Sequence, residues 1–207
     1  MKKYALWFLL LIPIYAAIVV RCTPSLHPIY SDSDIIYDPA LIGTWQPDDP
    51  DATWILDFKS ADDANRTYVM TFTDGENETW GTFVAHLAKI RDHIFLDAYP
   101  KLEDADANDA RFDLLLPTHI FALVEQIEPD LTLRDMNDDW LNSYLAENPN
   151  ALAHEFVQKE GEPEPTLVLT ASTEELQAFV IQHIQTEGAY DESSYHRVNE
   201  AAESAEE

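Results

Sequence analysis

The sequence predicts a mainly β protein with helices (α+β), in which an antiparallel barrel or sandwich carries a helical insertion and a C-terminal helix. Two observations support this fold class. Short segments between residues 54 and 134 alternate apolar and polar side chains, which is the period of a half-buried strand. After residue 136 the apolar residues recur at helical spacing instead. The chain has 207 residues, enough for one domain with appendages, and we place that domain at residues 39–188.

The strands are most clearly indicated where aromatic residues alternate with polar ones. Two segments place an apolar residue at every second position: Trp54, Leu56 and Phe58 in one, and Tyr68, Met70 and Phe72 in the other. Further strands are expected at residues 79–89, 94–99, 119–127 and 131–134, separated by turns at Asp74-Gly75, Arg91-Asp92 and Glu128-Pro129-Asp130. Strands so short and so closely spaced are typical of a sandwich or a barrel.

The helical part begins with a capping signal. Asn137 can cap a helix whose apolar face carries Trp140, Leu141, Tyr144 and Leu145. A second short helix is expected at residues 151–157, and a strand at residues 167–169. Ser172-Thr173-Glu174-Glu175 is a capping box for a last helix, with the apolar stripe Leu176, Phe179, Val180 and Ile184. Residues 189–207 are polar and acidic, which predicts a disordered tail.

The N-terminal segment has the layout of an export signal. Lys2 and Lys3 precede an apolar run over residues 4–20, and Arg21 and Cys22 follow it. Residues 1–21 are therefore expected to be a signal peptide cut before Cys22 or an uncleaved signal-anchor. A buried core helix is the third alternative. Residues 22–38 contain two prolines and no clear period, so we expect a tether between this segment and the domain.

Two resemblances bear on the anchor. Val19-Val20-Arg21-Cys22 resembles the lipobox of bacterial lipoproteins, although Arg21 stands where that pattern has a small residue. Residues 25–45, beginning Ser25-Leu26-His27-Pro28-Ile29-Tyr30, look like a group of small bacterial lipoproteins of unassigned function. The resemblance implies lipidation of Cys22 and a place in the bacterial cell envelope, facing the periplasm or the exterior. Thr23 in place of aspartate implies sorting to the outer membrane.

Gly43-Thr44-Trp45 resembles the Gly-x-Trp start of lipocalin-like barrels. In that family the glycine permits a tight start of the first strand, and the tryptophan plugs one end of the barrel. The resemblance also implies an arginine near the last strand that covers the tryptophan, and Arg134 is the candidate at a strand end. The alternative is that Trp45 is an ordinary core tryptophan on an early strand.

Charge and motifs exclude several classes of function. The chain has 39 acidic and 12 basic residues and a net charge of −27, which repels nucleic acid and anionic lipid headgroups. The stretch Asp104, Asp106 and Asn108 matches the start of a calcium loop but lacks its glycine and its final glutamate. The scattered histidines form no zinc pattern, and no nucleotide-binding glycine loop or serine-hydrolase motif occurs. We therefore expect no metal and no cofactor.

The leading functional hypothesis is a non-enzymatic, membrane-tethered binding protein with a small amphipathic ligand inside its sheet. The candidate ligand-binding residues are aromatic residues of the early strands: Trp54, Tyr68, Phe72, Trp80 and Phe83. One alternative is a structural or assembly lipoprotein that binds an envelope protein. Another is a hydrolase with an unrecognised carboxylate site, to which Asp97, inside an apolar strand, could contribute.

Overall fold

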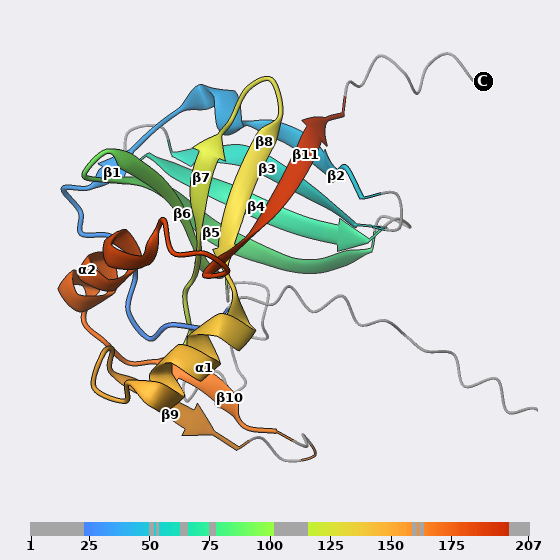
Figure 1. The fold of residues 1–207 in the computed structure, drawn as a ribbon. Helices are drawn as coiled ribbons and strands as arrows, with labels where there is room; N and C mark the ends of the chain where they lie inside the picture. Colours follow the sequence, from blue (N-terminus) through green and yellow to red (C-terminus); the bar gives the residue numbers. More distant parts are fainter. Residues whose placement is uncertain are drawn as a thin grey trace, which may run out of the picture.

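The computed structural model of this protein describes residues 23–49, 52, 54–62, 66–74, 78–101, 116–158, 161 and 164–198. In this part of the chain, eight antiparallel strands close into a barrel (Figure 1). The predicted fold class is therefore confirmed, and the alternative of a barrel or a sandwich is decided in favour of the barrel. The signal segment at residues 1–21, Cys22 and the calcium-like stretch Asp104–Asn108 lie outside the described residues.

Each barrel strand pairs with the next one along the chain, apart from the last. The bounds are β2 Gly43–Pro47, β3 Trp54–Asp62, β4 Thr67–Asp74, β5 Thr79–Ile90, β6 His93–Pro100, β7 Ile120–Gln126, β8 Leu131–Met136 and β11 Tyr190–Arg197. The barrel closes because β5 also pairs with β6, and β11 lies between β8 and β2. A short strand, β1 (Ile35–Ile36), pairs with the C-terminal part of β5.

The interior of the barrel is lined by the apolar residues of the alternating strands. Trp45, Phe58 and Tyr68 have no exposed surface, and they belong to one cluster with residues from all eight barrel strands. The alternation seen in the sequence therefore gives the inward face of β3 and β4 correctly. The 3₁₀ helix Pro39–Leu41 adds Leu41, also fully buried, to this cluster.

A second layer lies in the long connection between β8 and β11. It contains α1 (Asp138–Glu147), β9 (His154–Val157), β10 (Thr166–Leu169) and α2 (Thr173–His183), which gather on one side of the barrel in Figure 1. Its apolar residues form a cluster with outward-facing residues of the barrel wall, such as Phe95 and Leu123. The strands beneath are thus buried on both faces, which is why β6 and β7 are apolar without alternation.

Local signals place the two helices correctly. The Asn137 side chain accepts a hydrogen bond from the Trp140 amide, and both bonds of the Ser172–Glu175 capping box are present. The predicted strand at residues 167–169 is confirmed as β10. The expected short helix at residues 151–157 is wrong, because His154–Val157 pairs with β10 as a strand. Among the described residues, neither helix has the length and apolar character to cross a bilayer.

Two boundary predictions differ from the structure. Residues 23–38 are not a free tether: Ser25 exchanges backbone hydrogen bonds with His119, and Ile29 is fully buried against the second layer. The acidic tail does not begin at residue 189, because β11 fills the gap between β8 and β2. The sequence of β11 is polar and has no apolar period, so it gave no signal for a strand. The strand forms because its two neighbours satisfy its backbone hydrogen bonds.

Candidate binding site

One end of the barrel is closed by a tryptophan and an arginine. Trp45 is fully buried, and its indole N–H donates to the Leu41 carbonyl at 2.9 Å. The guanidinium of Arg197 lies 4.2 Å from the centre of the Trp45 ring and donates to the carbonyls of Ile42 and Ala40, at 2.6 Å each. This cation–π contact and the two charged hydrogen bonds tie the last barrel strand to the start of the first.

The arginine that covers Trp45 is Arg197, and the candidate Arg134 is wrong. Arg134 lies on the outside of β8, where it contacts the Tyr190 ring and donates to Glu125 at 2.7 Å. Gly43 has a φ of +138°, and a Cβ atom there would lie 2.2 Å from Arg197 Nη1. The glycine of the Gly-x-Trp pattern therefore has a physical role, because only its missing side chain leaves room for the guanidinium.

Tyr68 belongs to this closed end rather than to an open site. Its hydroxyl accepts from the Asp38 amide at 2.7 Å and donates to the Asp38 carbonyl at 3.0 Å. Its ring stacks on Tyr37 at 5.0 Å between centroids. Tyr68 therefore fixes the chain that leads into the 3₁₀ helix, and the structure gives it a packing role.

The barrel contains a cavity of about 140 Å³. It lies toward the end at which β3 and β7 begin, away from Trp45, and its walls are almost entirely apolar. A single water occupies roughly 10–15 Å³ by a comparable measure, so the space exceeds that of a few waters. The lining residues are Trp54, Leu56, Met70, Phe72, Phe83, Leu96, Ala98, Ile120, Phe121, Ala122, Leu133, Asp135 and Tyr195.

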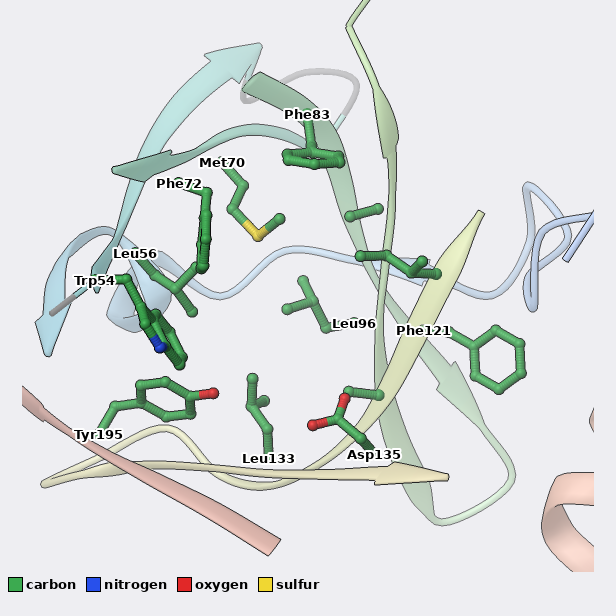
Figure 2. A pocket seen from close by; sticks show the side chains of 13 residues that line it. Trp54, Leu56, Met70, Phe72, Phe83, Leu96, Phe121, Leu133, Asp135 and Tyr195 are labelled. Carbon is green, nitrogen blue, oxygen red and sulfur yellow. The ribbon is translucent and has the colours of Figure 1, made fainter. Parts of the chain in front are cut away.

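Three of the five predicted ligand-binding residues line this cavity. Trp54, Phe72 and Phe83 come from three consecutive strands, and Figure 2 shows their rings around the cavity. Tyr68 lies at the closed end, as described above. Trp80 lies in β5, and its side chain is outside the described part of the structure. Whether these residues bind a ligand stays a prediction.

Two polar lining residues were not predicted. Asp135 on β8 and Tyr195 on β11 direct a carboxylate and a hydroxyl toward the cavity, with Leu133 between them in Figure 2. Asp135 follows Leu131 and Leu133 at every second position, so alternation along β8 could have placed it inside. The ring of Tyr195 packs near that of Trp54, with 5.5 Å between the two ring centroids. No pattern in the polar sequence of β11 indicated an inward tyrosine.

A second polar cluster lies on the outer wall, under the N-terminal part of the described chain. Asp97 is fully buried, accepts from the Ile29 amide at 2.9 Å, and lies 2.7 Å from His119 Nδ1. Within the described residues, Asp97 thus pairs with His119 and not with a second carboxylate. Burial lowers the pKa of the neighbouring His86, an effect that the Asp97 carboxylate partly opposes, and the lowered pKa favours the neutral ring.

Hydroxyl groups around this cluster hold the N-terminal part of the described chain in place. Ser25 Oγ donates to the His27 carbonyl at 2.7 Å, and the hydroxyls of Tyr30 and Thr67 lie 3.1 and 3.3 Å from the two ring nitrogens of His86. These contacts fasten residues 25–30 to the barrel. Within the described ranges, no three His, Cys, Asp or Glu side chains gather as a metal site would require.

His183 lies where the sequence placed it, on the apolar stripe of α2. Its side chain is buried among the rings of Trp140, Tyr144 and Phe179, and Nδ1 lies 3.3 Å from the Thr186 hydroxyl. Burial lowers the pKa of His183, which favours the neutral ring. This histidine is a core residue.

Comparisons of the chain with protein families, with curated proteins and with solved structures find no match.

Proposed function

We propose that this chain is an exported, membrane-tethered protein of the bacterial envelope whose barrel binds a small, largely apolar molecule. The observation that supports a ligand is the cavity, which is lined by aromatic and aliphatic side chains and lies in a barrel whose other end is closed by Trp45 and Arg197. Its size is close to that of an apolar cavity of about 150 Å³ that holds benzene. A compact ring or a short branched chain fits such a space.

Binding is tested with toluene, which is apolar and compact. We expect toluene to raise the midpoint of thermal unfolding in a concentration-dependent way and to change tryptophan fluorescence, because Trp54 lines the cavity. Ala98→Leu should abolish both effects, since Ala98 is buried and faces the cavity. The control is Leu116→Ala, whose side chain is 79% exposed and does not line the cavity. If toluene changes neither the unfolding midpoint nor the fluorescence of the wild-type protein, the proposal of ligand binding is contradicted.

The export and tether part of the proposal is supported by Lys2 and Lys3, the apolar run that follows them, and Cys22. Mass spectrometry of the membrane fraction separates the two anchors. An acylated N-terminal Cys22 indicates a lipoprotein, with attachment lost in Cys22→Ser, whereas an intact Met1 indicates a signal-anchor. Recovery of the unprocessed chain away from the membrane would contradict both.

A second candidate function, a structural or assembly lipoprotein, is favoured by β9. Phe156 and Val157 are 49% and 45% exposed on this strand, which pairs with β10 on one side within the described chain. An exposed edge strand with apolar residues can pair with another protein. Phe156→Lys should then release an envelope partner recovered by crosslinking and leave toluene binding unchanged. Equal recovery of the partner with the wild-type protein and with Phe156→Lys would count against this candidate.

A further inference from the structure

The cavity has a single charged residue among the described residues that line it, Asp135. The other lining side chains are aromatic or aliphatic, except for the hydroxyl of Tyr195. Figure 2 shows the Asp135 carboxylate at the cavity wall and directed inward, as is the Tyr195 hydroxyl on the other side of Leu133. A carboxylate at an apolar wall favours a bound group that carries positive charge and donates hydrogen bonds, because charge-assisted hydrogen bonds are stronger than those between neutral groups.

A second carboxylate lies beside Asp135 on the neighbouring strand. Asp191 on β11 is the direct partner of Asp135 in the antiparallel pairing. Directly opposed residues share a face of the sheet with Cβ atoms roughly 4.5–5.5 Å apart, and like charges in such positions repel. Asp191 is exposed at the start of β11 and accepts a hydrogen bond from the Asn137 side chain at 2.7 Å. A cation bound near Asp135 would therefore be attracted by two neighbouring carboxylates.

The charge of the whole chain acts in the same direction. With a net charge of −27, the protein attracts cations and repels anions. Field lines concentrate in a recess with apolar walls, so the concentration of small cations should be highest near the carboxylates. Charge at the site and charge of the protein thus favour the same ligand class.

We propose that the ligand of the barrel is a small organic amine, with a compact apolar ring or alkyl group in the cavity and its ammonium group bound by Asp135. Asp191 lies at the outer side of this ammonium site. The inference rests on the proposed ligand-binding function, and it adds the chemical class of the ligand. The apolar walls hold the carbon skeleton, and the carboxylate distinguishes an amine from a neutral or acidic molecule of the same shape.

Four probes with the same ring test this proposal: toluene, benzyl alcohol, benzylamine and benzoate. Affinities are measured by calorimetry at pH 7 and low salt. We expect benzylamine to bind at least about ten-fold more tightly than toluene, since a hydrogen bond to a charged group contributes this much or more. Benzoate should bind most weakly. These comparisons use the wild-type protein alone, so they do not depend on the folding of a variant.

Asp135→Asn keeps the size of the side chain and removes its charge. This variant should bind benzylamine and toluene within about two-fold of each other, with toluene affinity as in the wild type. Asp92→Asn is the control, because it removes one charge from the exposed turn between β5 and β6. It should leave the preference for benzylamine unchanged.

Each outcome decides between the two proposals. If toluene binds but benzylamine binds no better, or if benzoate binds best, the amine proposal is overturned and the binding function stands. A preference for benzylamine that survives in Asp135→Asn also overturns it. If none of the four probes binds, the proposed function itself fails, and the amine proposal fails with it.

Discussion

Replacing Gly43 by alanine should destabilise the barrel at its closed end. The added Cβ atom would lie 2.2 Å from Arg197 Nη1, and the φ of +138° at this position is one that side chains rarely adopt. The backbone strain costs about 1–3 kcal/mol. The guanidinium must also move, which weakens its two hydrogen bonds to carbonyls and its contact with the Trp45 ring.

The size of the second effect follows from these contacts. A hydrogen bond to a charged group contributes roughly 1.5–3 kcal/mol, and an exposed cation–π contact roughly 0.5–1 kcal/mol. The Arg197 side chain is 30% exposed, so part of each contribution is replaced by water. For Gly43→Ala we therefore expect a loss of about 3–5 kcal/mol in the free energy of unfolding, measured by urea titration with tryptophan fluorescence.

Two controls separate the strain from the clash. Gly161→Ala introduces a side chain at a φ of +86° with no atom within 4 Å, so it should cost only about 1–2 kcal/mol. In an Arg197→Met background, Gly43→Ala should lose the part of its cost that comes from the guanidinium, giving a coupling energy of about 2 kcal/mol in a double-mutant cycle. The reasoning is refuted if Gly43→Ala costs no more than Gly161→Ala, or costs the same in both backgrounds.

Three further predictions concern buried polar groups. Because burial lowers the pKa of His183 below its ordinary value of 6.5, the unfolded chain binds the proton more tightly, and stability should fall as the pH drops below about 6.5. His183→Phe should flatten this dependence in urea titrations between pH 8 and pH 5, and an unchanged slope would argue against it. Tyr68→Phe removes both hydrogen bonds to the Asp38 backbone and should cost about 1–2 kcal/mol in the same titration, with a loss below 0.5 kcal/mol showing that these bonds are replaced by water. Asp97→Ala leaves the buried Ile29 amide without its acceptor and should cost about 3 kcal/mol or more. Hydrogen exchange of that amide should accelerate more than that of the Leu123 amide in β7, and equal acceleration would show that Asp97 does not hold this segment.

The amino-acid sequence by itself determined part of the local structure. Alternation in β3 and β4 fixed which residues point inward, because side chains of a strand alternate between its faces. Asn137 and the Ser172–Glu175 capping box fixed the starts of both helices, because their side chains satisfy amides within the same turn. Three of the five aromatic residues proposed for ligand binding line the cavity for the same reason.

Tertiary structure decided what depends on residues distant in the chain. Arg197 reaches Trp45 only because β11 pairs with β2, and the polar sequence of β11 carries no apolar period that would reveal a strand. The short segment at residues 154–157 became a strand because β10 was available to pair with it. Asp135 became a cavity residue only when closure of the barrel placed it opposite the aromatic walls. Local patterns encode which way a side chain points, whereas strand pairing decides what it meets there.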